Sequence, residues 1–318
     1  MTESRQPAPL LGLAIGDSLG GPFETKHFSS QELARWDGSF HTWEINEIQP
    51  ERKPGEWTDD TKAALALATS LVEAETYNPV SALARYMEWY DSGDHRGMGK
   101  TIKQALQRIS QGYHWDQSGI LHAEGNGTAM RVAPIGAFYH RNVLTAAHMA
   151  RIDAGLTHNS IEASEGSAAV AIGVSLLCDG YVKSEVLAPV IAFLNDSKVQ
   201  EGLIRVKRVL QSNPSPADIL NTLIQWGTGA HVVQTIPAAF LCFLGTTSYQ
   251  DAVALAIHAG GDTDTTAAIT GALAGSLYGR AALEGYLGQL EQAQHLIRVE
   301  DLLFELAPEV PEDAKPDA

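Results

Sequence analysis

Apolar residues recur at helical spacing through most of this chain, and this periodicity constrains the fold more than any other feature. After Thr58, for example, Leu65, Ala68, Leu71 and Val72 lie on one face of a helix. Similar stretches predict helices near residues 81–90, 100–110, 143–153, 184–194, 199–211, 216–226, 250–258, 265–278 and 297–306. We find no run that alternates β-branched with polar residues, the pattern of a half-buried strand. The sequence therefore predicts an all-α fold.

The chain lacks a linker that would divide it into domains. Its 318 residues are enough to bury a large core. The proline-containing stretch Ser212–Pro216 is short and suits a loop between two helices. The end of the chain is rich in proline and acidic residues, a composition typical of disorder. We predict one all-α domain over residues 10–306, flanked by disordered segments at 1–9 and 307–318.

The balance of charge excludes some functions. The chain has 22 basic and 38 acidic residues, for a formal net charge of −16. Nucleic-acid binders need Lys and Arg to neutralise phosphates, so general nucleic-acid binding is not expected. The N-terminus lacks the basic and apolar regions of a signal peptide, and the apolar stretches are short and interrupted. We therefore expect a cytoplasmic protein without a membrane partner, and we expect it to be a monomer.

Two acidic clusters stand at predicted helix starts. Thr58–Asp60 precedes a helix predicted from Lys62, and Asp262–Thr265 follows two glycines and precedes a helix predicted from Ala267. Each could be a helix cap, because Thr and Asp satisfy free N–H groups at a helix start. Within a helix, however, the side chains of an Asp-x-Asp pair point about 200° apart. In the turn before the helix, glycines let both carboxylates converge on one ion.

The donor atoms of these clusters indicate which ions they could hold. Both clusters offer only carboxylate and hydroxyl oxygens, which favour Mg²⁺ or Mn²⁺ over Zn²⁺. Four carboxylates suit two metal ions better than one, and without cations they would repel each other. The sequence therefore predicts a binuclear Mg²⁺ or Mn²⁺ site. Bound cations would also explain how so acidic a protein attracts an anionic substrate.

Several segments resemble, in order, the motifs of the ADP-ribosylglycohydrolase family. They are Gly12–Glu24, Thr58–Thr61, Gly125–Arg131, Thr157–Asn159 and Gly260–Thr265. Each segment has little specificity alone, but together they cover most of the chain. The resemblance implies a compact orthogonal helical bundle with two Mg²⁺ or Mn²⁺ ions. It also implies hydrolysis of an N- or O-glycosidic bond at C1″ of ADP-ribose.

The resemblance further implies the residues of the site. The metal ligands correspond to Thr58, Asp59, Asp60, Asp262, Asp264 and Thr265. The residues that line the ADP-ribose cleft correspond to Gly97, Gly99, Gly125, Asn126, Gly127, Met130 and His158. The catalytic carboxylates correspond to Glu24, on a mobile loop near the scissile bond, with Asp59 and Asp264. Glycosidic cleavage passes through an oxocarbenium-like state, which carboxylates stabilise while they move protons.

Three further features of the matching segments lead to separate expectations. The loop Gly125–Thr128 precedes a predicted helix, so its backbone N–H groups and the helix dipole suit a pyrophosphate. Arg131 is expected to pair with a buried acid. Asp17 is expected to stabilise a helix rather than to bind metal.

One segment bears on the linkage that is cleaved. Arginine-directed members of the family carry an acidic residue, in an Asp-x-Gly-Asn-Thr segment, thought to address the guanidinium group. Here the corresponding stretch begins Arg96-Gly97-Met98-Gly99, with Met98 near the place of that acid. It is closer to the Arg-Gly-Tyr-Gly stretch of serine-directed members. We therefore expect an ADP-ribosylated protein or small ADP-ribosyl conjugate as substrate, O-linked rather than arginine-linked.

Three alternatives stay open beside this prediction. An arginine-linked substrate is the first. The second is a non-catalytic relative that binds ADP-ribose; it would be expected to lose metal ligands, which are all present here. The third is a phosphotransferase, because Gly99-Lys100-Thr101 resembles the end of a phosphate-binding loop. Against the third, Gly93 stands five residues before Gly99 where the pattern needs four, and no strand is predicted before it.

Overall fold

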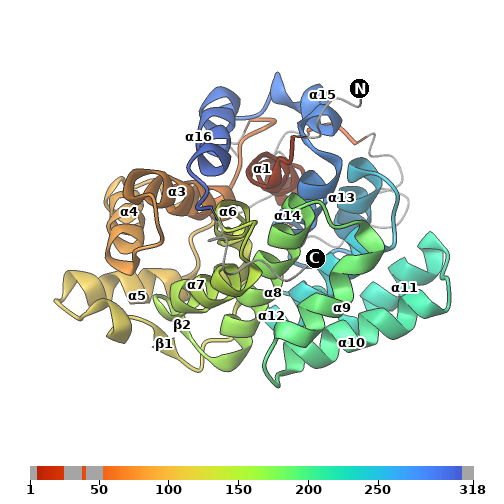
Figure 1. The fold of residues 1–318 in the computed structure, drawn as a ribbon, viewed down its shortest axis with the longest axis horizontal. Coiled ribbons are helices and arrows are strands. Elements are labelled where there is room, and N and C mark those ends of the chain that lie inside the picture. Colours follow the sequence, from red (N-terminus) through yellow and green to blue (C-terminus); the bar gives the residue numbers. More distant parts are fainter. Residues whose placement is uncertain (1–5, 25–37, 41–52, 310–318) are drawn as a thin grey trace.

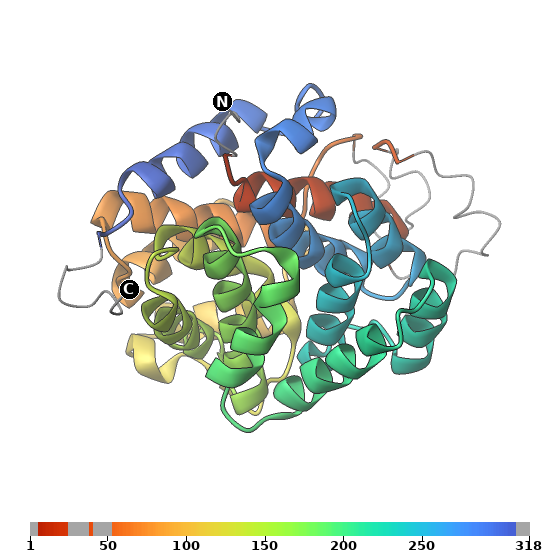
Figure 2. The ribbon, with the colours of Figure 1, turned by 45° about the vertical axis from the view of Figure 1, so that its right-hand side comes forward.

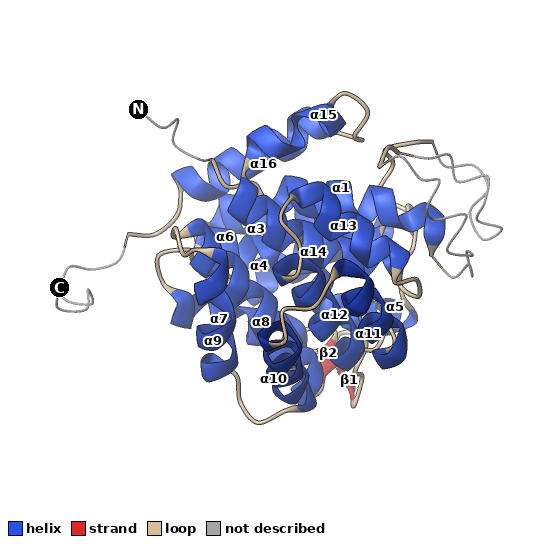
Figure 3. Ribbon diagram, turned by 90° about the vertical axis from the view of Figure 1, so that its right-hand side faces the viewer, coloured by secondary structure: helices blue, strands red, loops and turns tan. Residues whose placement is uncertain are grey.

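The computed structural model describes residues 6–24, 38–40 and 53–309. Helices make up nearly all the regular structure of these residues (Figures 1 and 3). The α-helices are α1 (Pro9–Gly20), α3 (Asp59–Ala74), α4 (Pro79–Asp91), α5 (Lys100–Ser110), α6 (Ala133–Phe138), α7 (Val143–Gly155), α8 (Ile161–Cys178), α9 (Lys183–Phe193), α10 (Lys198–Gln211), α11 (Pro216–Trp226), α12 (Val232–Leu244), α13 (Tyr249–His258), α14 (Thr263–Tyr278), α15 (Glu284–Leu287) and α16 (Ala293–Glu305). The 3₁₀ helices are η1 (Gly21–Phe23), η3 (Trp115–Gln117), η4 (Asn126–Arg131) and η5 (Arg280–Leu283). The all-α fold class is confirmed.

Helices α1 and α14 lie side by side (Figure 1) and pack on each other more extensively than any other described pair. In Figure 2, α1 is the long red helix of the interior. The two helices run antiparallel, because Gly12 lies against Gly271 and Gly20 lies against Thr263. Glycine permits the close approach, because a Cβ atom on Gly16 would lie 2.1 Å from the carbonyl oxygen of Ala267. At the end of α1, Thr263 Oγ1 donates a hydrogen bond to Gly20 O at 2.8 Å. The pairing therefore brings the C-terminal end of α1 beside the N-terminal end of α14.

The N-terminal end of α1 is held by a side chain of α16. Glu300 Oε1 accepts hydrogen bonds from the N–H groups of Leu10 and Leu11, at 2.7 and 3.2 Å. These groups belong to the first turn of α1, which has no acceptors of its own. Ala8 occupies the N-cap position and makes no side-chain capping bond. A carboxylate from a distant helix thus takes the place of a local cap.

Helix α8, with 18 residues, is the longest described helix and lies in the core. By length and composition it could cross a membrane, which is contrary to the expectation from sequence. However, 83% of the helix is buried inside the fold, as is typical of the central helix of a globular domain. No other described helix meets the same criterion.

Predicted and observed helices agree where one helix face is polar. Helices α5 and α11 have the predicted bounds. The sequence pattern does not predict α1 or α12, because both are buried nearly all round and lack a polar face. It also does not predict the parallel strands β1 (Ile120–Leu121) and β2 (His158–Asn159), shown in Figure 3. These strands are very short and pair segments that are distant in sequence.

The ends of the chain are only partly described. Within the segment 1–9, predicted to be disordered, Ala8 is buried and its N–H donates to Gly275 O at 3.0 Å. Residues 1–5 lie outside the described residues, as do residues 310–318 of the predicted C-terminal tail. The organisation into a single domain stays a prediction.

Candidate functional site

The N-terminal ends of α3 and α14 meet at a cavity of about 270 Å³. Its lining residues are Glu24, Asp59, Asp60, Gly97, Gly99, Lys100, Thr101, Ile102, Gly125, Asn126, Gly127, Met130, His158, Ala230, Asp262, Asp264 and Thr265. Every predicted site residue except Thr58 belongs to this lining. The fold therefore brings together residues predicted from separate segments. A larger cavity, of about 660 Å³, lies between α9, α10, α11 and α12 and contains none of them.

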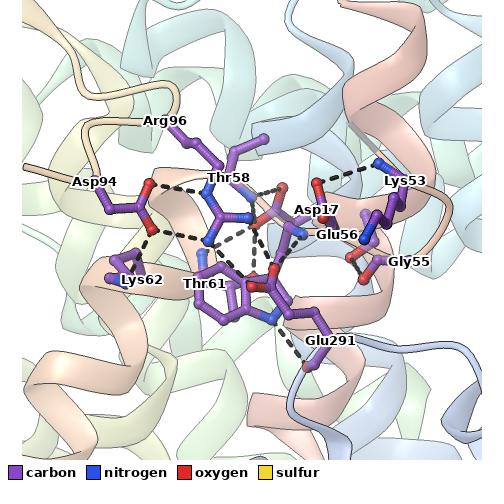
Figure 4. Close-up of polar contacts among 12 residues, drawn as sticks. Asp17, Lys53, Gly55, Glu56, Thr58, Thr61, Lys62, Asp94, Arg96 and Glu291 are labelled. Atoms are coloured by element: carbon purple, nitrogen blue, oxygen red, sulfur yellow. Dashed lines mark hydrogen bonds and ion pairs between the residues drawn. The ribbon is translucent and has the colours of Figure 1, made fainter. Parts of the chain in front are cut away.

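Asp17 of α1 organises the start of α3 (Figure 4). Its carboxylate accepts hydrogen bonds from the N–H of Thr58 at 2.9 Å, the N–H of Thr61 at 3.0 Å and the hydroxyl of Thr61 at 2.6 Å. Asp17 thus caps α3 from another helix, which confirms its predicted stabilising role. Thr58 occupies the N-cap position, but its side chain makes no capping bond. The expected helix start at Thr58 is therefore present, but the side chain that caps it is that of Asp17.

Because Asp17 caps α3, the side chains of the first cluster are available for other contacts. Thr58 Oγ1 donates to Asp60 Oδ2 at 3.2 Å. The other carboxylate oxygen, Oδ1 of Asp60, is buried and has no hydrogen-bond partner among the described residues. Such an oxygen is costly to bury unless a cation or water contacts it. Asp17, Asp60 and Asp264 each place a carboxylate oxygen within 4.8 Å of the others.

The second cluster begins at Asp262, which occupies the N-cap position of α14 without making a side-chain capping bond. Instead its Oδ2 accepts a hydrogen bond from Asn126 Nδ2 at 2.7 Å, so the predicted cleft loop and the acidic cluster are in direct contact. The preceding Gly260 and Gly261 have φ angles of 73° and 79°. This left-handed backbone favours glycine, as the sequence indicated.

Glu24 joins the second cluster from the end of α1. It follows η1 directly, and its carboxylate lies within 4.8 Å of those of Asp262 and Asp264. This placement follows from the antiparallel pairing of α1 with α14. The loop on which Glu24 was predicted to move continues into residues 25–37, which lie outside the described residues.

Burial and mutual repulsion make these carboxyl groups hard to ionise. Burial, followed by the charge of Asp17 and, to a smaller extent, Glu24 and Asp262, raises the pKa of Asp59 to about 8. The pKa values of Asp60 and Asp264 are raised well above the usual range, first by burial and then by neighbouring carboxylates. Divalent cations would relieve both effects. The arrangement could therefore hold hard metal ions through its oxygen atoms.

A group of ion pairs holds the segment that faces Asp59 (Figure 4). Arg96 donates to Asp94 at 2.8 and 2.9 Å and to Glu291 at 2.9 and 3.1 Å. Its guanidinium lies 5.0 Å from the ring centre of Trp57. Hydrogen bonds from Arg96 and Lys62 keep the pKa of Asp94 well below its usual range.

Gly97 follows this anchored arginine and lies directly against the acidic cluster. Its φ angle is 71°, and a Cβ atom here would be 2.2 Å from Asp59 Oδ1. Both the backbone conformation and the lack of space therefore require glycine. Met98, which bears on the expected linkage, is 6% exposed and belongs to the hydrophobic core.

Another part of the lining consists of the Gly125–Gly127 loop and His158. The loop is anchored because Asn126 N–H donates to Ala230 O at 3.0 Å. A Cβ atom on Gly125 would lie 3.3 Å from His158 Nε2, so the absence of a side chain there leaves room around the ring. The pairing of β1 with β2 places His158 opposite Ile120 in the parallel register.

Four lining residues are not among those predicted: Lys100, Thr101, Ile102 and Ala230. The first three belong to the start of α5. The N-cap residue of this helix is Gly99, which has no side chain to cap the free N–H groups. A helix start with a nearby amine can attract an anion. The sequence did contain a signal for Lys100 and Thr101, because Gly99-Lys100-Thr101 resembles the end of a phosphate-binding loop. In the structure α4 and a turn precede Gly99, rather than a strand, so the phosphotransferase alternative is wrong.

Fold and site together define an all-α protein in which buried carboxylates gather beside a glycine-rich cleft. A profile of the ADP-ribosylglycohydrolase family matches residues 2–313, and the chain belongs to this family. The recognition of the family, the type of fold and the predicted enzyme class are thereby confirmed.

Individual relatives span nearly the whole chain. An ADP-ribosylarginine hydrolase, Tri1, of Pseudomonas putida is 28% identical over 318 residues, covering 97% of this chain and 80% of the relative. The ADP-ribosylhydrolase ARH3 of Danio rerio is 25% identical over 328 residues, covering 88% of this chain and 84% of the relative. A solved structure of an ADP-ribosylglycohydrolase-related protein complex matches with a TM-score of 0.73 at 26% identity, covering 95% of this chain and 97% of that one.

Proposed function

We propose that this chain is a Mg²⁺- or Mn²⁺-dependent hydrolase that cleaves the glycosidic bond at C1″ of ADP-ribose on a modified side chain or related conjugate. The observation that carries the proposal is the meeting, in one cavity, of buried carboxylates from α3 and α14 with a glycine-lined cleft. Membership of the ADP-ribosylglycohydrolase family supports the same reaction. The relatives Tri1, an ADP-ribosylarginine hydrolase, and ARH3, an ADP-ribosylhydrolase, support it as well.

The residues assigned to the cations are Thr58, Asp59, Asp60, Asp262, Asp264 and Thr265. All offer oxygen atoms, as hard divalent ions require. The buried Oδ1 of Asp60, which has no partner among the described residues, and the pKa of Asp59, raised to about 8, both fit a site that cations neutralise. Two such ions, when bound, supply positive charge that can orient the ribose hydroxyls and a water molecule.

We assign the proton transfers and charge stabilisation to Glu24, Asp59 and Asp264, all of which line the cavity. A carboxylate beside the anomeric carbon stabilises the positive charge that develops there, and a carboxyl group can protonate the leaving oxygen. Glu24 is the carboxylate among them that comes from outside the two helix starts.

The pyrophosphate of ADP-ribose needs hydrogen-bond donors, which a protein of net charge −16 must supply locally. The start of α5, with Lys100, and the Gly125–Gly127 loop line the same cavity as the carboxylates. Helix starts and glycine loops both present backbone N–H groups to phosphates. These parts of the lining are the proposed pyrophosphate contacts.

We favour an O-linked, serine-type substrate over an arginine-linked one. Among the described residues, every carboxylate that lines the cavity belongs to the acidic group: Glu24, Asp59, Asp60, Asp262 and Asp264. Met98 is buried in the core, and Lys100 in the lining would repel a guanidinium. An arginine-linked substrate would therefore find no separate acid among the described lining residues, whereas a serine-linked substrate needs none. Because the relative Tri1 is an ADP-ribosylarginine hydrolase, the arginine linkage is the alternative.

A panel of ADP-ribosylated substrates tests both parts of the proposal. Serine-linked, arginine-linked and nucleic-acid-linked ADP-ribose are incubated with the protein, in excess chelator and with Mg²⁺ or Mn²⁺, and released ADP-ribose is measured. We expect metal-dependent release that is fastest from the serine-linked peptide. Full release in chelator would refute the metal requirement, and faster release from the arginine-linked peptide would refute the linkage. Binding of ADP-ribose without release from any substrate would favour a non-catalytic relative.

A further inference from the structure

Behind the cleft, a fully buried ion pair fixes the guanidinium of Arg131. Arg131 Nε donates to Asp153 Oδ2 at 2.8 Å, and Nη2 donates to the backbone oxygen of Asp153 at 2.9 Å. Tyr86 donates its hydroxyl to Asp153 Oδ1 at 3.0 Å, and its ring lies 4.7 Å from the guanidinium carbon. The pairing expected for Arg131 is thus confirmed. These contacts fix the orientation of the planar guanidinium group. They therefore also fix the direction in which its third nitrogen, Nη1, donates hydrogen bonds.

That nitrogen, Nη1, donates to Thr157 Oγ1 at 3.0 Å. A guanidinium group can only donate, so the Thr157 hydroxyl must accept this bond and keeps one hydrogen to give. Thr157 is fully buried, and the other partner of its hydroxyl is His158 Nδ1, at 2.9 Å. If Nδ1 carried a proton, the hydroxyl hydrogen would have no acceptor among the described residues. The hydroxyl therefore donates to Nδ1.

These bond directions define the state of the imidazole. Because Nδ1 accepts a hydrogen bond, the neutral ring carries its proton on Nε2. Burial and the nearby charge of Arg131 lower the pKa of His158 to about 3, so the ring stays neutral at physiological pH. His158 lines the cavity, and no described residue accepts a hydrogen bond from Nε2. The Nε2–H group thus lies at the cleft without a partner in the described part of the chain.

We infer that Thr157, oriented by Arg131, positions His158 as a permanent Nε2–H donor to an acceptor oxygen of the ADP-ribose moiety. The inference rests on the proposed function, since it takes ADP-ribose as the ligand. Thr157 is a positioning residue, because it acts through His158. With the opposite tautomer, His158 would present a lone pair to the oxygen and repel it. A series of hydrogen bonds runs from Asp153 through Arg131 to Thr157. It therefore determines whether His158 attracts or repels the ligand.

The test compares Thr157→Val, which removes the hydroxyl at nearly constant shape, with Thr157→Ser, which keeps it. ADP-ribose binding is measured by calorimetry, and the histidine tautomer by ¹⁵N NMR, with the His158 signals identified from their loss in a His158→Gln variant. We expect the wild type to show a protonated Nε2. The Thr157→Val variant should bind ADP-ribose about tenfold more weakly, and Thr157→Ser should restore binding.

A second pair of variants does not depend on Thr157. A glutamine at position 158 can place its amide N–H near the position of Nε2, whereas a shorter asparagine cannot. His158→Gln should therefore bind ADP-ribose more tightly than His158→Asn. A protonated Nδ1 in the wild type, or equal ADP-ribose binding by the wild type and a folded Thr157→Val variant, would overturn the inference. Failure of the wild type to bind or release ADP-ribose would instead overturn the proposed function, while NMR would still report the tautomer.

Discussion

At the scale of single residues, identical side chains have different roles because their hydrogen-bond partners differ. Asp17 and Asp60 are both buried aspartates near the start of α3. The carboxylate of Asp17 is occupied by donors from Thr58 and Thr61, so it is a structural cap. Asp60 keeps one buried oxygen without a partner among the described residues. This difference assigns Asp60, rather than Asp17, to the proposed metal site.

The Asp60→Asn variant tests this assignment. We expect a loss in kcat/KM of more than about 100-fold, because an assigned metal ligand is lost. Its melting temperature in chelator should equal or exceed that of the wild type, since a buried acidic group is removed from a repulsive cluster. Addition of Mn²⁺ should raise that temperature less than in the wild type. Asp116→Asn, at an exposed aspartate, is the control, and equal Mn²⁺ effects in all three proteins would exclude Asp60 as a ligand.

Glu300 allows a prediction about pH. Burial, the largest cause, raises the pKa of Glu300 to about 8 in the folded protein. An unfolded glutamate has a pKa of about 4.3. Between about pH 4.3 and pH 8, Glu300 therefore binds more protons in the folded state than in the unfolded state. Its contribution makes the folded state less stable as the pH rises through this window. In Glu300→Gln this dependence should disappear. The measurement is urea unfolding at several pH values. In that window, the free energy of unfolding of the variant should rise relative to that of the wild type by up to about 1.4 kcal/mol for each pH unit.

The matched control for this pH prediction is Glu305→Gln, at an exposed position of the same helix. Its stability difference from the wild type should not change with pH in the same way. If the difference between Glu300→Gln and the wild type is constant from pH 5 to pH 8, Glu300 does not titrate in that window.

At the scale of elements, the site depends on helix ends and on the loops that meet them. The first turns of α1 and α3 are capped by Glu300 and Asp17, each from another helix. The start of α14 keeps Asp262 in contact with Asn126 of the cleft loop. Local capping residues are therefore replaced by distant ones, which leaves the local side chains available for the site.

The loop before α5 offers a matched pair of glycines for testing this arrangement. Gly97 and Gly93 both have positive φ angles, 71° and 77°, so alanine should cause similar backbone strain at each. A Cβ atom would lie 2.2 Å from Asp59 Oδ1 at Gly97, but would meet nothing within 4 Å at Gly93. We expect similar losses of stability in Gly97→Ala and Gly93→Ala.

The activities of the two variants should differ. Gly97→Ala displaces Asp59, and a displacement of about 1 Å can cost roughly 100-fold in rate. Gly93→Ala should keep a rate near that of the wild type. Comparable kcat/KM values for the two variants, measured on the same ADP-ribosylated peptide, would show that the contact with Asp59 does not matter for the reaction.

At the scale of the whole molecule, the net charge of −16 and the buried acids oppose folding unless cations are bound. Mg²⁺ or Mn²⁺ should therefore raise the melting temperature of the protein. By linkage, a single ion at 100 times its dissociation constant stabilises by about 2.7 kcal/mol. NaCl at equal ionic strength should have a smaller effect, because it screens surface charge but does not occupy the cavity. Equal effects of the two salts in a thermal unfolding assay would contradict a specific metal site.

The local pattern of the sequence was sufficient for much of this molecule. Amphipathic periodicity predicted α5 and α11 at their observed bounds. Residue type predicted the oxygen-donor character of both acidic clusters, and glycine predicted the backbone before α14. These properties are local, because they depend on neighbouring residues and on the chemistry of single side chains. The family resemblance then named residues that, apart from Thr58, all line one cavity in the structure.

Other properties depended on contacts between residues that are distant in sequence. Helices α1 and α12 are buried nearly all round, so no polar face marked them. The capping of α3 by Asp17 and the orientation of His158 through Thr157 both need a partner from another element. The two clusters could each have been ordinary helix starts. Only the antiparallel packing of α1 on α14, with Asp17 holding α3, places them together and makes a shared cation site physically reasonable.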